Sequence, residues 1–396
     1  MLTRRQMLER SLLLSLSPVV PAFLARAAQA AEAERDRRIL VVIQLDGGND
    51  GLNTVVPFRD ENYARLRPKL QVPGDKLIKL NDEIALHSAL KPFGDLFNDG
   101  RLCVVQGVGY PNPNRSHFES MSIWHAARLD ESEHGQYGWL GRALDTRVAA
   151  GTEPQAVYAS ANSLPVALWG RRSVTAVIKS KDALRLDAPV ELLQAGNAAS
   201  GGSELSRSIA TACHDAFTTC QRLAPVLSKD TPPSDSSYRL ADDLSTISAL
   251  IKADTPARVY YAVQGGYDTH ASQEYDHARL LRTLGREVGA FLTDLKASGL
   301  DDRVLVLAFS EFGRRAAENA SAGTDHGAAA PVFLAGPKLA TGIHGPTPNL
   351  GDLADGDVRM EFDFRRLYAT LLDQWLEIPS LEILGEAFEP LPILRS

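Results

Sequence analysis

Short runs of apolar, often β-branched residues recur along this chain, and they constrain its fold more than any other feature. The clearest runs are ILVVIQL from Ile39, RLCVVQGVG from Arg101, RVYYAVQG from Arg258, RVLVLAFS from Arg303 and PVFLAGP from Pro331. Helical patterns lie between and after them and begin near Ser88, Asp242, Ser272 and Asp363. Strands without polar alternation that are separated by helices are typical of parallel sheets buried on both faces. The sequence therefore predicts an α/β fold with a mostly parallel central sheet flanked by helices.

The first thirty residues differ from the rest of the chain. Arg4 and Arg5 precede an apolar stretch over residues 11–24, and Ala28-Gln29-Ala30 has the small-x-small pattern of a cleavage site. The apolar stretch is interrupted by prolines and is shorter than the ~20 residues that a membrane span needs. Residues 1–30 therefore resemble a cleaved twin-arginine signal peptide, which predicts a periplasmic or otherwise exported protein without an integral span after cleavage.

Residues 31–396 are expected to form the functional domain. Within it, residues 150–236 contain the Gly/Ser-rich stretch GNAASGGS and the polar stretch SKDTPPSDSS, which are typical of loops. This region is predicted to be an insertion or cap on the sheet.

The charge of the chain limits its partners. The formal net charge is −7, and the predicted leader carries four Arg and one Glu, so its removal changes the net charge to −10. An acidic protein of this kind is not expected to bind nucleic acid or an anionic membrane surface.

Polar residues follow the predicted strands at the points where ligands bind in open α/β sheets. Asp46 follows the first strand, and Arg115, Ser116 and His117 follow the second. The third is followed by Asp268 and His270, the fourth by Glu311 and Arg314, and Asp325 and His326 precede the fifth. Each motif alone fits a turn, a helix cap or a surface ion pair. Their joint placement at strand ends indicates a site.

The residue types favour a divalent metal, with Zn or Mn as the expected ion in one or two copies. The predicted ligands are Asp46, Asp268, His270, Glu311 and His326. Ser116 is a candidate nucleophile at the start of a helix, where the helix N-terminus would hold an anionic group. Arg115 or Arg314 would hold the oxygens of the substrate.

The motifs LDGGNDGLNTVVPF, NRSHFESMSIW, GGYDTH, FSEFGRR and GTDHGAAAPVFLAG, in this order, resemble the DUF1501 family. That family is in turn similar to the alkaline phosphatase and sulfatase superfamily, which implies an alkaline phosphatase-like fold. By this resemblance Asp46 matches the first metal-binding Asp, Ser116 matches the nucleophile, Asp268 with His270 matches the second ligand pair, and His326 matches the last His.

Two departures from the superfamily pattern concern the metal ligands. Asp268 and His270 are two residues apart rather than four, and the expected Asp-His pair after the fourth strand is here Glu311-Phe312. One metal position therefore lacks an imidazole, unless Asp325, Asn49, Asp50 or His117 supplies the missing ligand.

The leading hypothesis is an exported metal-dependent hydrolase of phosphate or sulfate esters, with a small molecule or a polysaccharide ester as substrate. The alternative is a catalytically impaired periplasmic binding or assembly protein on the same scaffold, since Phe312 replaces a ligand. A serine esterase that uses Ser116 with His117 or His326 ranks lowest, because the chain lacks a Gly-x-Ser-x-Gly nucleophile elbow.

Overall fold

The computed structural model describes residues 37–130, 132, 136–147, 155–160, 163–173, 175–178 and 239–395. The predicted leader lies outside these residues, and so does most of the predicted insertion. The chain divides into two units, Met1–Arg38 and Ile39–Ser396, and the helices and strands of the described residues lie in the second unit.

A central sheet organises the second unit. Its strand order is β11 (Gly342–His344), β5 (Leu102–Gly109), β10 (Ala330–Ala335), β9 (Val304–Phe309), β1 (Ile39–Leu45), β8 (Val259–Gln264), β6 (Ala156–Tyr158) and β7 (Thr175–Val177), and β12 (Phe362–Asp363) also pairs with β5. Every described pairing within this central sheet is parallel except those of β10, which runs antiparallel to β5 and β9. The predicted mostly parallel sheet is confirmed.

The reversed direction of β10 positions the segment that precedes it. The carboxyl ends of β1, β5, β8 and β9 lie at one edge of the sheet, because these strands run the same way. An antiparallel strand begins at the edge where its neighbours end. The residues before β10 therefore reach the same edge as the residues after the other four strands.

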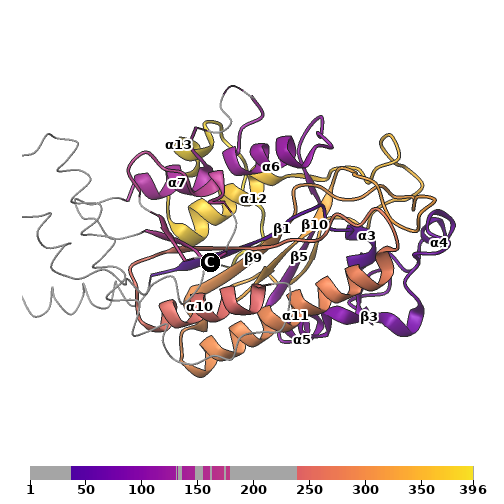
Figure 1. Cartoon of the computed structure of the whole chain (residues 1–396), viewed down its shortest axis with the longest axis horizontal. Helices are drawn as coiled ribbons and strands as arrows, with labels where there is room; N and C mark the ends of the chain where they lie inside the picture. Colours follow the sequence, from indigo (N-terminus) through magenta and orange to yellow (C-terminus); the bar gives the residue numbers. More distant parts are fainter. Residues whose placement is uncertain are drawn as a thin grey trace, which may run out of the picture. The chain divides into compact units, whose positions relative to one another are not determined.

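Helices cover both faces of the sheet (Figure 1). One layer contains α5 (Lys91–Asn98), α10 (Leu240–Lys252) and α11 (Gln273–Ala297), and the other contains α6 (His117–Ala126), α7 (Trp139–Asp145), α12 (Phe364–Thr370) and α13 (Ser380–Leu384). The side chains of β1 alternate between the layers: Val41 and Ile43 join the core with α5, α10 and α11, whereas Leu40 and Val42 join the core with the other helices. All residues of β1 are buried, which explains its lack of polar alternation.

Smaller elements complete the unit. They are α3 (Gly51–Thr54), α4 (Glu61–Leu66), the three-stranded sheet of β2 (Val55–Val56), β4 (Ala85–His87) and β3 (Leu77–Lys79), the short 3-10 turns η1 (Gly74–Lys76), η2 (Ser88–Leu90), η4 (Val166–Leu168) and η6 (Asp301–Arg303), and the π-helical turn η7 (Leu371–Leu376). Among the helices of the described residues, none combines the length and the hydrophobicity that crossing a lipid bilayer requires.

The region predicted as an insertion begins as part of the sheet. β6 pairs with β8, and β7 pairs with β6, so both strands extend the central sheet at one edge. Their runs, Ala-Val-Tyr and Thr-Ala-Val, are only three residues long, too short for the sequence pattern to separate them from loops. Residues 179–238 lie outside the described part, so a cap formed by them stays a prediction.

Asp243 on α10 generates a prediction about stability. Burial raises the pKa of Asp243 to about 7, although Ser160 Oγ donates a hydrogen bond of 2.5 Å to Asp243 Oδ2. The folded state therefore keeps a proton that the unfolded state, with a pKa of about 3.9, has already lost. The free energy of unfolding should decrease by up to ~1.4 kcal/mol per pH unit as the pH rises from about 4 to about 7. Asp243→Asn should remove this contribution.

Urea unfolding of the two proteins between about pH 5 and pH 8 measures the difference. Asp302→Asn, at an exposed position of η6, is the control and should keep the wild-type slope. The same slope in Asp243→Asn and wild type would contradict the assignment to Asp243.

Candidate metal centre

Five segments meet at the sheet edge described above. They are the loops after β1, β8 and β9, the segment before β10, and the start of α6 after β5. They supply Asp46, Asp268, Glu311, His326 and His117, respectively. The predicted gathering of carboxylates and imidazoles at this edge is therefore a geometric feature of the structure.

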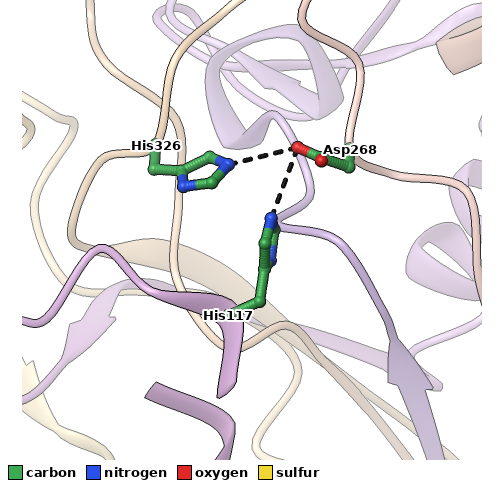
Figure 2. A group of neighbouring side chains, drawn as sticks. All are labelled: His117, Asp268 and His326. Carbon is green, nitrogen blue, oxygen red and sulfur yellow. Dashed lines mark hydrogen bonds and ion pairs between the residues drawn. The ribbon is translucent and has the colours of Figure 1, made fainter. Parts of the chain in front are cut away.

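One carboxylate oxygen, Asp268 Oδ1, is the point on which three imidazoles converge. The distances from this oxygen are 3.0 Å to His270 Nε2, 3.1 Å to His326 Nε2 and 3.4 Å to His117 Nε2. Figure 2 shows His117 and His326 pointing at Asp268 from two different segments of the chain. Four potential ligand atoms are thus held around one position.

The second ring nitrogen of each histidine faces an acceptor. His117 Nδ1 lies 2.7 Å from Glu311 Oε1, and His326 Nδ1 lies 2.7 Å from the backbone oxygen of Arg115. His270 Nδ1 lies 3.3 Å from Asp325 Oδ1. Because carboxylates and carbonyls accept hydrogen bonds, each Nδ1 carries the proton in the neutral ring, and each Nε2 has a free lone pair. This is the orientation that metal-binding histidines take.

Two observations test whether the residues fit a metal ion. His117 Nε2 is buried and has no hydrogen-bond partner among the described residues, and His270 Nε2 lies 2.9 Å from His326 Nε2. Two neutral imidazoles with protonated Nδ1 atoms would point lone pairs at each other there, an arrangement that a cation between them relieves.

The spacing of the donors agrees with such an ion. Ligand atoms about 2.0 Å from a tetrahedral zinc are about 3.3 Å apart, close to the separations around Asp268 Oδ1. One ligand atom each from His117, Asp268 and His326 lies within 4.8 Å of the other two. The site therefore fits a divalent cation held by His117, Asp268 and His326, and His270 Nε2 lies next to Asp268 and His326 as a further donor.

Burial and neighbouring charges shift the pKa values of Asp268, Asp46 and His117. Partial burial opposes the ionisation of Asp268, but the hydrogen bond and the positive charge of Arg314 lower the pKa of Asp268 to about 2. Burial, followed by the negative charge of Glu311, raises the pKa of Asp46. The hydrogen bond with Glu311 raises the pKa of His117, so protons compete with a metal for this ring at acidic pH.

The start of α6 places His117. Asn114 Oδ1 accepts a 2.8 Å hydrogen bond from the backbone N–H of Ser116, the N-cap residue of the helix. Further along α6, the Trp124 ring stacks on Phe309 and Phe364, with centroid distances of 4.9 and 4.4 Å. The helix is thus anchored in the core, and its first residue projects into the site.

The two glycines after Asp46 are needed for the approach of the loops. Gly47 and Gly48 have φ angles of +115° and +73°, which residues with a side chain rarely adopt. A Cβ on Gly47 would lie 2.5 Å from the backbone nitrogen of Asp268, and one on Gly48 would overlap the Phe312 ring. Gly47 therefore lets the loop after β1 pack directly against the loop that carries Asp268, and Gly48 lets it pack against Phe312 in the loop after β9.

Glu311 has a different position from that predicted. Its side chain is fully buried, and Oε1 accepts hydrogen bonds from the backbone N–H of Gly47 and from His117 Nδ1. Glu311 therefore orients His117 instead of joining the cluster of ligand atoms. Asp46 accepts a 3.0 Å hydrogen bond from Gln44 Nε2 and does not belong to the group of His117, Asp268 and His326 whose ligand atoms lie within 4.8 Å of one another.

Arg314 was expected to hold substrate oxygens, but it is buried. Its Nε donates to Gly48 O at 2.6 Å and Nη1 donates to Thr324 O at 2.8 Å. Nη2 lies near Gly47 O, Tyr267 O and Asp268 Oδ1. The structure corrects this prediction: Arg314 joins the loops of the site, and all three of its guanidinium nitrogens have acceptors.

Arg115 also has protein partners. Its Nη2 lies 2.7 Å from Asp357 Oδ2 and 2.9 Å from Asp355 Oδ2, and its backbone oxygen holds His326. The prediction that Arg115 holds substrate oxygens therefore conflicts with its geometry, because two carboxylates already balance its charge.

Phe312 stands where the superfamily pattern has a histidine, and His117 is the candidate residue that brings an imidazole to the cluster around Asp268. Of the other candidates, Asp50 forms a buried ion pair of 2.5 Å with Arg67, and Asn49 Oδ1 lies 3.0 Å from the buried His277. Phe312 is buried, and its ring centroid lies 4.9 Å from those of His117 and His326. The available signal for His117 was its place directly after Ser116 at the start of a helix.

Measured zinc affinities can distinguish the role of His117 as a ligand from the role of Glu311, which orients His117. His117→Ala should weaken zinc binding by more than about 100-fold, whereas Glu311→Gln should weaken it by about 10- to 100-fold, the range for outer-shell partners. Competition with a fluorescent chelator measures both dissociation constants. His344→Ala is the control, because His344 bonds to Ala340 O at β11. Wild-type affinity in His117→Ala would remove this residue from the ligand set.

Several solved structures resemble this fold at low identity. The C-terminal periplasmic domain of EcEptC from Escherichia coli, in complex with Zn, has 8% identity and a TM-score of 0.40, with 76% of this chain and 74% of that chain covered. A sulfatase from Pseudoalteromonas sp. has 10% identity and a TM-score of 0.38, with 93% and 72% covered. A protein in the alkaline phosphatase superfamily from Vibrio parahaemolyticus has 11% identity and a TM-score of 0.35, with 79% and 64% covered.

Sequence comparison defines the family. No curated protein matches the chain significantly. Residues 37–380, which include every residue of the candidate metal centre, match the family described as "Protein of unknown function (DUF1501)". The chain therefore belongs to the DUF1501 family.

Proposed function

We propose that the protein is an exported, metal-dependent hydrolase of phosphate or sulfate esters. The observation that carries the proposal is the convergence of three imidazole Nε2 atoms on Asp268 Oδ1, next to a serine at the start of a helix. His117, Asp268, His270 and His326 would hold one divalent ion. The imidazole-rich donor set favours Zn, with Mn as the alternative ion.

Ser116 is the proposed nucleophile. It directly precedes the ligand His117, it is only half-buried, and its hydroxyl has no hydrogen bond among the described residues. A bound divalent ion lowers the pKa of a nearby hydroxyl and offsets the charge that develops on transfer. Ser116 Oγ would form a bond to phosphorus or sulfur as the bond to the leaving oxygen breaks, and the serine proton would end on the leaving alcohol.

The helix α6 supports the same reaction. The backbone N–H groups of its first turn, from His117 to Glu119, point toward the helix start and can stabilise the oxygens of a transferred group. Water would then cleave the serine ester, restoring the Ser116 hydroxyl and releasing phosphate or sulfate. The substrate would be a small-molecule or polysaccharide ester, and the leader-like residues 1–30 support export by the twin-arginine pathway.

Ser116→Ala should abolish turnover of 4-nitrophenyl phosphate or 4-nitrophenyl sulfate and leave the zinc content unchanged, because the methyl group cannot attack and all proposed ligands remain. Release of nitrophenol and elemental mass spectrometry measure the two quantities. Ser122→Ala on the same helix is the control and should keep its activity. Unchanged activity of Ser116→Ala would remove Ser116 as nucleophile.

Chelation tests the requirement for a metal. Incubation with EDTA should abolish ester hydrolysis, and added Zn or Mn should restore it, because the imidazoles cannot replace the charge of the ion. Activity that survives complete removal of metal would contradict the proposal. A protein that binds zinc but hydrolyses neither ester would support the alternative of a binding or assembly protein.

A further inference from the structure

We propose that the site prefers an ester whose transferred group carries one negative charge, such as a sulfate monoester or a phosphodiester, over a dianionic phosphate monoester. The inference rests on the proposed function and specifies its substrate class. It follows from the distribution of fixed charges around the candidate metal centre.

Negative charge is concentrated at the sheet edge. Asp268 lies among the imidazoles, and Asp325 lies 3.3 Å from His270. Glu311 lies 2.7 Å from His117, and Asp46 is close enough to Glu311 and Asp268 to interact with both charges. A divalent ion together with the Arg314 guanidinium, which lies 2.8 Å from Asp268 Oδ1, would offset three of these four carboxylates and leave one negative charge.

The guanidinium groups of the arginines near the site already contact protein acceptors, so they are not free to pair with a second negative charge on the substrate. Arg314 is buried with acceptors on all of its guanidinium nitrogens, and one of those acceptors is Asp268 itself. The charge of Arg115 is balanced by Asp355 and Asp357.

Arg315, the third arginine near the site, also contacts protein acceptors. Arg315 Nη2 donates to Asp355 O at 2.5 Å, and Arg315 Nε lies 3.9 Å from Asp357 Oδ1. Among the described residues that contact these loops, each arginine is therefore already held by protein acceptors.

The charge of the substrate then decides its affinity. Dianionic phosphoryl groups are usually held by arginine forks that are free to form two parallel hydrogen bonds. Here the second negative charge of a phosphate monoester would face carboxylates, while the described arginines near them already contact protein acceptors. Like charges in close contact disfavour binding. A monoanionic group of the same tetrahedral shape avoids most of this repulsion.

A binding experiment compares two ligands of similar shape. Phenyl sulfate carries one negative charge, and phenyl phosphate carries two at a pH of about 8, above the second pKa of about 6 of phosphoryl groups. The zinc-loaded Ser116→Ala protein is used so that turnover does not interfere, and isothermal titration calorimetry measures both dissociation constants. Phenyl sulfate should bind at least about tenfold more tightly. Tighter or equal binding of phenyl phosphate overturns the inference, and so does binding of neither ester.

A charge variant tests the part assigned to Arg115. Asp355→Asn, whose side chain is 84% exposed, removes one carboxylate from Arg115 and should lower the preference for phenyl sulfate by about threefold or more. Asp352→Asn is the matched control: it lies on the same loop, is 62% exposed and pairs with Arg359. An unchanged preference in Asp355→Asn, or the same change in both variants, overturns the assignment to Arg115.

The outcomes separate this inference from the proposed function. A protein that does not bind zinc refutes the metal centre and this inference with it. A zinc-loaded protein that hydrolyses esters through Ser116 but binds phenyl phosphate more tightly refutes only the charge preference.

Discussion

The candidate centre depends on the hydrogen bonds of one buried guanidinium, that of Arg314. A buried cation is strongly unfavourable unless acceptors surround it. Arg314 satisfies this requirement with backbone oxygens of the loop after β1, the loop after β8 and the segment before β10, together with Asp268. Arg314, in the loop after β9, therefore ties three other segments to each other and holds the carboxylate on which the histidines converge.

The direction of the strands determines which segments Arg314 can join. Four parallel strands end at one edge, and the antiparallel β10 begins there. Its reversal brings Thr324 and His326 to the loops that carry Asp46 and Asp268. Gly47 and Gly48 then allow the loop backbones to approach within the distance that the guanidinium spans.

The hydrogen bonds of the three Nδ1 atoms explain why each histidine turns its Nε2 toward Asp268. Each Nδ1 faces an acceptor from a different part of the chain: Glu311, Asp325 or the backbone of Arg115. Each Nε2 is consequently directed inward with a free lone pair. Arg115 was expected to bind substrate. Instead its backbone oxygen contacts His326, and its guanidinium pairs with Asp355 and Asp357.

Much of this arrangement could be predicted from the sequence. Apolar runs and helical periodicity determined the strands, the helices and the mostly parallel sheet, because burial on both faces requires uninterrupted hydrophobic strands. The positions of Asp46, Asp268, His270 and His326 directly after or before predicted strands likewise predicted that they lie at one edge of the sheet. Only the tertiary structure decided that His117 faces the centre, that Glu311 lies behind it and that Arg314 is buried. These assignments depend on the rotation of α6, the reversal of β10 and the hydrogen bonds between loops distant in sequence, which local patterns do not encode.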